Sequence, residues 1–332
     1  MKILLVKLSS LGDVVHTLPV VQDILTAMPG VQIDWVIEKA FAPLLTQVKG
    51  IHRVIPCELR RWRKSFWTTQ TLQAWRAFKA DLQRDDYDAV IDLQGLTKSA
   101  VVARLARLTA QGKRYAMANQ TDGSGYEAPT RWLADVAIEL PPHIHAVQRG
   151  RELAARALGY KLQKSLDFGL NYSSKWPSAQ SIRAQAAPEN IAFIHGSSRS
   201  DKTWPLQNWV ELGQRLMVDG HRVVLVHGSA AELAVSQTIA AQLGGSAVVL
   251  PLLALDALTR ELATCQGAIG VDSGVSHIAV ALGLPHVQIY NFDTAWRTGP
   301  LDCAHQVSVF AQPVPSVNAV WQAWLTCESA AT

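Results

Sequence analysis

The segment Ala268-Ile269-Gly270-Val271-Asp272-Ser273-Gly274-Val275-Ser276-His277-Ile278-Ala279-Val280-Ala281-Leu282-Gly283 combines a buried strand, a tight polar turn and the first turns of a helix. Where a parallel strand leads into a helix, unpaired backbone N–H groups and the positive end of the helix dipole point into the same space, which suits a phosphate. Gly274 allows close approach of a ligand, and Ser273, Ser276 and His277 add hydrogen-bond donors. The segment therefore predicts an anion site in an α/β fold. Taken alone, it also fits a plain helix N-cap and turn.

Two further junctions of this kind lie upstream. The apolar run 191–194 leads into His195-Gly196-Ser197-Ser198-Arg199-Ser200-Asp201-Lys202, in which the serine hydroxyls and the lysine ammonium suit a pyrophosphate. The run 223–226 leads into a turn in which Glu232 stands four residues after Gly228, a place from which an acid can bind ribose hydroxyls. The plainer alternatives are a solvated serine-rich loop and a first-turn glutamate beside the helix dipole.

Composition predicts a folded chain with two domains. The 332 residues are 48% apolar, which is enough for a large core. The net charge of +4 is too small to argue for a nucleic-acid binder, and we expect no such partner. Four separated cysteines without a C-x-x-C pair indicate neither a zinc site nor a disulfide framework, and they fit a reducing cytoplasm. We find no signal peptide or membrane-spanning run, so we expect any membrane contact to be peripheral.

Short apolar runs alternate with helical patterns, as in parallel sheets covered by helices on both faces. We expect two such doubly wound sheets, in domains that face an inter-domain cleft. The segment 167–188, rich in Ser, Gln, Ala and Pro, predicts a linker, and a final helix over 317–325 could pack back across the boundary. The predicted strands span residues 3–8, 33–36, 54–55, 89–92 and 112–116 in the first half and 191–194, 223–226, 248–250, 268–271 and 286–289 in the second.

The first strand ends in another glycine turn, Ser9-Ser10-Leu11-Gly12-Asp13, before a helix. The turn lacks the G-x-G-x-x-G pattern, which weakens the alternative of an NAD-dependent oxidoreductase. Asp13 is expected at the carboxyl edge of the sheet, where it can act as a general base or simply cap the helix. The turn after the fourth strand carries Asp92, Gln94 and Lys98, which are either polar contacts of the same site or turn formers.

The strongest basic cluster is Arg60-Arg61-Trp62-Arg63-Lys64, and aromatic and basic residues continue to Lys79. Arginine forks suit carboxylates and phosphates, while Trp and Phe suit an interfacial layer, so this segment fits an anionic amphiphile at a membrane surface. A solvated cationic helix face over buried aromatics is the plainer alternative. Single-stranded nucleic acid fits the residue types but not the low overall charge.

Together these motifs resemble the bacterial ADP-heptose:lipopolysaccharide heptosyltransferases, glycosyltransferase family 9, and most closely the members that build the inner core. The resemblance covers nearly the whole chain, and its motifs are residues 7–19, 60–64, 92–96, 201–205 and 272–277 in the family's order. It implies an α/β fold of the GT-B type with two Rossmann-like domains. Residues 1–170 would bind the acceptor, and residues 171–332 would bind ADP-heptose.

The resemblance also implies an inverting enzyme without a cofactor or an essential metal. It would transfer L-glycero-D-manno-heptose from ADP-heptose to a Kdo residue of Kdo–lipid A. Asp13 would be the base and Lys202, with Ser197 and Ser198, the diphosphate clamp. Glu232 would bind the ribose. The loop under the diphosphate and heptose would be Asp272, Ser273, Gly274 and His277, and the acceptor patch would be Arg60, Arg61, Arg63 and Lys64.

The chain departs from some relatives after Tyr290, where Asn291-Phe292-Asp293-Thr294 replaces the more usual glycine-proline-threonine turn. Serine stands at 197, 198 and 273, where relatives often have threonine, and the hydroxyl is kept. The remaining alternatives are a relative that adds a later core heptose and, from another class, a non-catalytic surface-binding protein. For the transferase we expect a monomer in the cytoplasm, peripheral on the inner membrane of a Gram-negative cell.

Overall fold

A computed structural model describes residues 1–65, 67–170, 189–301 and 303–331 of the chain. The chain divides into two compact units, Met1–Gly169 and Leu170–Thr332. This division falls one residue before the boundary that the sequence predicts. Most of the predicted linker, residues 171–188, lies outside the described residues.

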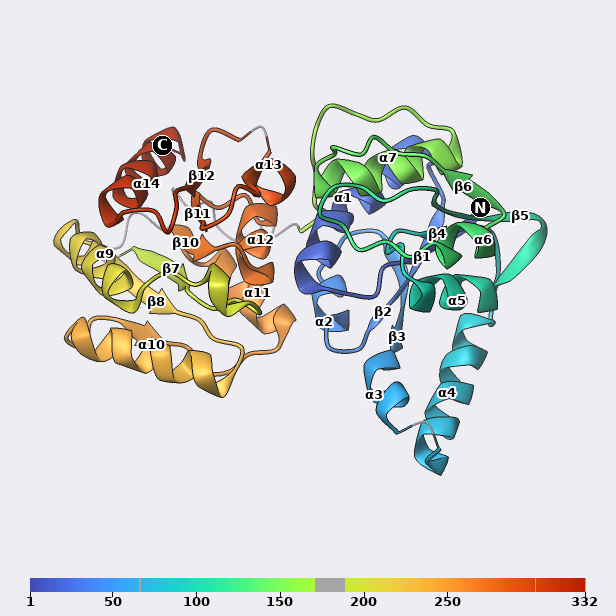
Figure 1. Cartoon of the computed structure of the whole chain (residues 1–332), viewed down its shortest axis with the longest axis horizontal. Coiled ribbons are helices and arrows are strands. Elements are labelled where there is room, and N and C mark those ends of the chain that lie inside the picture. The colour runs from blue at the N-terminus through green and yellow to red at the C-terminus, as the bar shows by residue number, and fades with distance from the viewer. Residues whose placement is uncertain (66, 171–188, 302, 332) are drawn as a thin grey trace. The chain divides into compact units, whose positions relative to one another are not determined.

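The first unit contains a parallel six-stranded sheet in the order β3-β2-β1-β4-β5-β6 (Figure 1). The chain reverses its direction of travel across the sheet between β1 and β4, and side chains at the carboxyl ends of these two strands surround the switch point. The strands are β1 (Lys2–Val6), β2 (Gln32–Glu38), β3 (Ile51–Cys57), β4 (Asp86–Asp92), β5 (Arg107–Met117) and β6 (Val136–Ile138). The helices are α1 (Leu11–Ala27), α2 (Ala42–Leu45), α3 (Leu59–Lys64), α4 (Thr69–Leu82), α5 (Thr97–Leu105), α6 (Pro129–Leu133) and α7 (Ala146–Leu158).

The two faces of the first sheet are covered by different helices. Alternate strand residues such as Leu4 and Val6 join a core with residues of α3, α4 and α5. Helix α1 packs along α7 (Figure 1). A buried, two-bond ion pair joins these helices, because Arg151 Nε and Nη2 donate to the Asp23 carboxylate at 2.7 and 2.8 Å. This ion pair fixes the C-terminal half of α1 to α7.

The second unit repeats the topology. Its parallel sheet has the order β12-β11-β10-β7-β8-β9, and its switch point lies between β7 and β10. The strands are β7 (Asn190–Ile194), β8 (Arg222–Leu225), β9 (Val248–Val249), β10 (Gly267–Val271), β11 (His286–Tyr290) and β12 (Gln306–Phe310). A 3-10 turn, η1 (Ser200–Lys202), precedes the helices α9 (Leu206–Val218), α10 (Ala230–Gln242), α11 (Leu255–Ala263), α12 (Gly274–Ala281), α13 (Ala295–Thr298) and α14 (Val317–Ala331).

The α/β fold with two doubly wound sheets is confirmed, and each of the ten predicted strands is present. Two edge strands were missed, β6 and β12. Strand β6 has only three residues, and β12 follows a crossover whose one helix, α13, is a single turn, so neither carries the strand-then-long-helix pattern. Val320, Trp324 and Cys327 of the final helix, α14, are buried in the core of the second unit.

None of the described helices is long and apolar enough to cross a membrane.

Candidate active site

Asp13 lies at the switch point of the first sheet, in the first turn of α1. Its Oδ2 accepts hydrogen bonds from the backbone N–H and the hydroxyl of Ser10, at 3.1 and 3.0 Å. The side chain of Asp13 is nevertheless 35% exposed. A carboxylate that is held at one oxygen by the N-terminal turn and reachable from solvent can act on a bound ligand.

Two cations flank the other oxygen of Asp13. Lys7 Nζ and Arg149 Nη2 each lie 3.8 Å from Asp13 Oδ1. Lys7 is almost fully buried at the end of β1, and its ammonium donates to the Leu93 carbonyl at 3.0 Å. Burial raises the pKa of Asp13, but Lys7, the Ser10 hydrogen bonds and Arg149 together outweigh it and hold this pKa below its ordinary value. Asp13 is therefore ionised at neutral pH.

The turn after β4 packs against the turn that carries Asp13. Asp92 is buried and accepts the Gln94 N–H at 2.9 Å and the Ser99 hydroxyl at 3.0 Å, and burial raises its pKa to about 6. Gln94 Oε1 accepts the N–H groups of Leu8 and Ser9, both at 3.1 Å. Asp92 and Gln94 are thus turn formers, the second of the two possibilities that the sequence left open.

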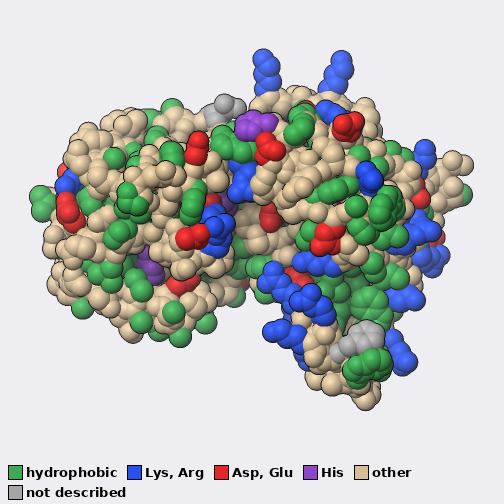
Figure 2. All heavy atoms as spheres, in the orientation of Figure 1, with side chains coloured by type: hydrophobic (Ala, Val, Ile, Leu, Met, Phe, Trp, Pro, Cys, Tyr) green, Lys and Arg blue, Asp and Glu red, His purple; other side chains and the backbone are tan. Residues whose placement is uncertain are grey.

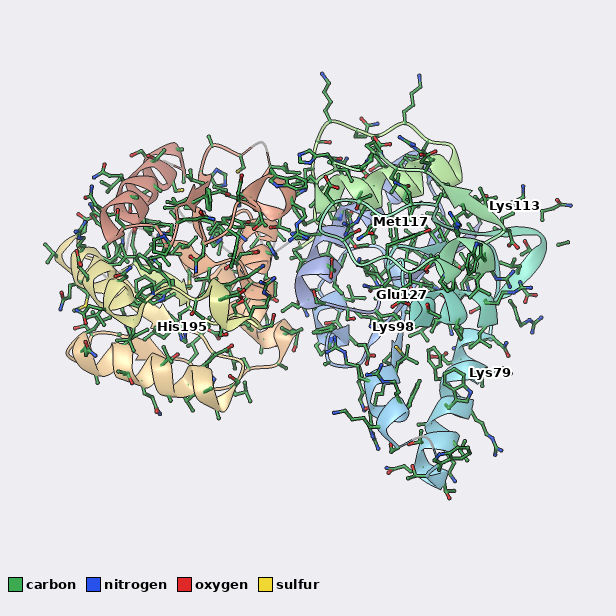
Figure 3. All side chains as sticks on the ribbon, in the orientation of Figure 1. Lys79, Lys98, Lys113, Met117, Glu127 and His195 are labelled. Carbon is green, nitrogen blue, oxygen red and sulfur yellow. The ribbon has the colours of Figure 1, made fainter. Side chains whose placement is uncertain are left out.

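Lys98, labelled in Figure 3 at the start of α5, donates to Ser9 Oγ at 3.2 Å. Glu127, labelled beside it, accepts the N–H of Thr97 at 2.7 Å. These contacts join the start of α5 to the turn after β1 and to the loop that precedes α6.

At the switch point of the second sheet, Lys202 forms an ion pair with Asp272. His277 Nε2 lies 3.4 Å from the other oxygen of the same carboxylate. Burial raises the pKa of Asp272, but His277 and Lys202 outweigh that effect and hold it well below the ordinary range. Three residues predicted from two separate motifs are thus in contact.

The turn between β10 and α12 forms as a helix N-terminus. Ser273 is the N-cap, and its hydroxyl accepts the N–H of Ser276 at 3.4 Å. Ser276 Oγ donates to the Val271 carbonyl at 2.6 Å. The N–H groups of the first turn, which begins at Gly274, have no partner inside the helix, so this end of α12 can accept an anion.

The loops after β7 and β8 meet at Gly196. A Cβ added there would lie 2.5 Å from the carboxylate carbon of Glu232, so only glycine permits this approach. Glu232 Oε2 accepts the Gly228 N–H at 2.6 Å, which makes it part of its own turn. Ser197 Oγ reaches the Asp272 carbonyl at 3.5 Å, and Ser198 is exposed. His195, labelled in Figure 3, joins α10 through its 2.7 Å contact with Ser236 Oγ.

Asn291 occupies the turn that departs from the family pattern. Its side-chain amide donates to the carbonyls of Asp201 and Thr203, at 3.1 and 2.9 Å. These two residues flank Lys202. The unusual turn therefore positions the loop that carries the lysine.

The basic cluster lies on α3, and Figure 2 shows blue side chains gathered over this helix. Arg60, Arg61, Arg63 and Lys64 are all exposed. Trp62, on the opposite side of the helix, is buried and packs edge-to-face on Trp75 with ring centroids 5.6 Å apart. Trp67 in the connection to α4 is 90% exposed, and position 66 lies outside the described residues.

The chain contains one D-x-D sequence, Asp86-Tyr87-Asp88, which our expectation of a metal-free site left out of account. It begins β4, so it lies at the amino edge of the sheet, opposite the switch point. Asp86 pairs with Arg107 at 2.7 Å, and Asp88 accepts the backbone N–H of Lys2 at 2.8 Å. Both acids have protein partners and neither belongs to the site.

Sequence reasoning gave no role to Lys7, Arg149 or Asn291. A lysine at the end of an apolar strand is a usable signal for the first, and the altered turn is one for the third. Arg149 has no local signal, because only the packing of α7 against α1 brings it to Asp13.

Comparison with known proteins identifies the family of this chain. Residues 75–319 match the sequence model of "Glycosyltransferase family 9 (heptosyltransferase)". "Lipopolysaccharide heptosyltransferase 1" of Pseudomonas aeruginosa is 39% identical over 90% of this chain and 81% of its own length. The protein of the same name from Escherichia coli K12 is 37% identical, over 87% of this chain and 88% of its own length.

Solved structures of similar proteins share the fold. "E. coli heptosyltransferase WaaC with ADP" superposes with a TM-score of 0.86 at 33% identity, covering 97% of this chain and 98% of that one. The same enzyme "with ADP-2-deoxy-2-fluoro heptose" gives a TM-score of 0.82 at 34% identity, with the same coverage of both chains. The fold is of the GT-B type, as the resemblance implied. The chain belongs to glycosyltransferase family 9, the heptosyltransferases.

Proposed function

We propose that this enzyme transfers L-glycero-D-manno-heptose from ADP-heptose to a Kdo residue of Kdo–lipid A during synthesis of the lipopolysaccharide inner core. Similar proteins support the donor and the pathway: relatives at 37–39% identity are lipopolysaccharide heptosyltransferases 1, and a similar structure holds a fluorinated ADP-heptose. The observation that carries the chemistry is Asp13, an ionised carboxylate that remains 35% exposed at a switch point.

Asp13 acts as the general base. As the acceptor oxygen attacks the anomeric carbon, the carbon–oxygen bond to ADP breaks and the hydroxyl proton passes to the carboxylate. A carboxylate is a weak base for a free alcohol, but the proton becomes acidic as the new bond forms, so a positioned aspartate suffices. Lys7 and Arg149 keep the base ionised, and the Ser10 hydrogen bonds hold its orientation.

Negative charge develops on the departing ADP. Lys202, His277 and the N-terminal turn of α12 stabilise it, as preorganised charges and dipoles do. Lys202 rests on Asp272 before the donor binds, and Asn291 holds the two backbone carbonyls that flank this lysine. This arrangement supports leaving-group departure without a metal or a cofactor.

The remaining donor contacts come from the loops after β7, β8 and β10. Ser197 and Ser198 hydrogen-bond the diphosphate, and Glu232 binds the ribose hydroxyls in exchange for its contact with Gly228. Asp272, Ser273 and Gly274 form the loop under the diphosphate and heptose. A glutamate at the start of α10 is compatible with ribose binding because such an acid accepts two hydroxyl hydrogen bonds.

The acceptor binds at the exposed cations of α3. Arg60, Arg61, Arg63 and Lys64 attract the carboxylates of Kdo, for which arginine forks are well shaped. The exposed Trp67 next to this helix suits the headgroup layer that holds lipid A. The enzyme thus works as a monomer on the cytoplasmic face of the inner membrane.

The test is ADP release from ADP-heptose with and without Kdo–lipid A. We expect release only with acceptor, and a large rise in acceptor KM when Arg60 and Arg63 are both changed to alanine. Arg76→Ala/Lys79→Ala on the neighbouring helix α4 is the matched control. Release with a heptosylated core acceptor but not with Kdo–lipid A would assign the chain to a later step, and unchanged kinetics in the Arg60→Ala/Arg63→Ala variant would refute the acceptor patch.

A further inference from the structure

The amino edge of the second sheet carries a cluster that the transfer reaction does not use. Glu189 directly precedes β7, His221 directly precedes β8, and Glu328 lies in the last turns of α14. The nucleotide-binding loops follow the carboxyl ends of β7 and β10, at the other edge of the same sheet. The cluster is therefore remote from the site of transfer.

The donor atoms of the cluster converge. His221 Nε2 lies 3.1 Å from Glu328 Oε1, and His221 Nδ1 lies 4.0 Å from Glu189 Oε2. In the part of the chain that the structure describes, one group of histidine, cysteine and carboxylate side chains brings three donor atoms within 4.8 Å of one another, and it is this one. Donors bound tetrahedrally to zinc at ~2 Å lie about 3.3 Å apart, so binding requires side-chain movements of roughly 1.5 Å at most.

His221 supplies the independent sign that a ligand is missing from this edge. Its side chain is only 7% exposed, and its Nδ1 is buried without a hydrogen-bond partner. The ring is held edge-on by Trp324, with centroids 6.0 Å apart. An ion bound at Nδ1 beside Glu189 would satisfy this nitrogen, and Nε2 on the other side of the ring would then carry the proton and donate it to a carboxylate.

The surrounding charge favours a cation. A third carboxylate, Asp219, lies 3.7 Å from His221 Nε2. Among the described residues, Asp219 and Glu328 pair with His221 and with no lysine or arginine. The amide of Gln266 donates to Glu189 Oε1 at 3.1 Å, which fixes that carboxylate with its other oxygen toward the ring. Such an outer hydrogen bond is typical of a metal-binding carboxylate.

We propose that Glu189, His221 through Nδ1, and Glu328 bind a divalent transition-metal ion of the Zn²⁺ type, with water as the fourth ligand and Asp219 as an acceptor for the Nε2 proton. One imidazole and two carboxylates suit Zn²⁺ better than Ca²⁺ or Mg²⁺, which take oxygen ligands alone. The ion would tie α14 to the starts of β7 and β8. Its role is structural, so it leaves the metal-free transfer chemistry intact.

The test is calorimetric titration of the metal-stripped full chain with Zn²⁺, together with thermal unfolding with and without the ion. We expect one bound ion per chain and a higher Tm in its presence. His221→Asn and Glu328→Gln should each weaken binding at least tenfold while ADP release without added metal stays at the parent rate. Glu328→Gln keeps the shape of a partly exposed side chain, so it tests the site even if His221→Asn does not fold.

The matched control is His305→Asn, because His305 Nε2 lies 3.3 Å from Cys303 Sγ and could bind zinc elsewhere. Binding that is lost in this control and kept in Glu328→Gln would overturn the proposal, as would the absence of any bound ion. If no ion binds, His221 acts only as a hydrogen-bond donor to the neighbouring carboxylates.

Discussion

The two halves of the chain share one topology and place an aspartate at each switch point, yet the two carboxylates are used differently. Asp13 is 35% exposed and lies 3.8 Å from its nearest cations. Asp272 is 8% exposed, and Lys202 and His277 contact it directly. The pKa of each is lowered, but only Asp13 keeps an accessible oxygen. The strand–turn–helix pattern brings an acid to each switch point, and the neighbouring residues decide whether the acid stays accessible or pairs with a lysine.

Replacing Asp13 should have the largest effect. We expect Asp13→Asn to lower kcat by about 10²- to 10⁴-fold, because proton removal from the acceptor loses its base. The Tm should not change, since the side chain is partly exposed. Acceptor-dependent ADP release and thermal unfolding measure the two quantities. Asp86→Asn, the same change at the other edge of the sheet, is the control. If Asp13→Asn keeps a kcat within tenfold of the parent, Asp13 is not the base and does not differ in function from Asp272.

Lys202→Met tests the second half. We expect kcat/KM for ADP-heptose to fall by about 10²- to 10³-fold, because the charge that stabilises the departing diphosphate is gone. Steady-state kinetics with varied donor measure this. Arg215→Met removes a cation from an exposed pair on α9 and should leave kcat/KM unchanged. An equal loss of kcat/KM in both variants would mean that the net charge of the protein, and not the position of Lys202, causes the effect.

Asp272→Asn tests whether the second aspartate stabilises the folded protein. Its pKa is lowered in the folded protein, so its contribution to stability is present above the ordinary aspartate pKa and is lost as pH falls through the lowered value. At pH 7 we expect the variant to be less stable by about 2 kcal/mol. Urea unfolding between about pH 2 and 7 should show a constant difference above about pH 4 and a shrinking difference below it. A difference that is constant over this range would exclude the ion pair as its cause.

Arg149→Gln should have the smallest effect. Loss of this cation raises the pKa of Asp13, so the acid limb of the kcat/KM profile should move to higher pH by less than about one unit. Activity at pH 7 should change only a few fold. Arg156→Gln, an exposed arginine of the same helix, gives the baseline. If the limb does not move, the 3.8 Å contact has no influence on the base.

Local sequence was sufficient to predict the position of candidate site residues that lie within a single strand–helix turn. The turn at Ser273 and Gly274, the acid at the start of α1 and the lysine after β7 each follow an apolar strand directly, and the carboxyl ends of parallel strands meet at one edge. The same reasoning could not separate Asp92, a buried turn former, from a ligand-binding acid, because both have the same sequence neighbours.

The sequence by itself determined the family, the α/β class and the two repeats of strand, turn and helix, because hydrophobic periodicity and turn residues act over short segments. Only the tertiary structure decided that Arg149 reaches Asp13, that Asn291 holds the loop of Lys202, and that Glu189, His221 and Glu328 converge. These contacts join residues far apart in the chain. Their energies depend on distance and burial in the folded state, which no local pattern records.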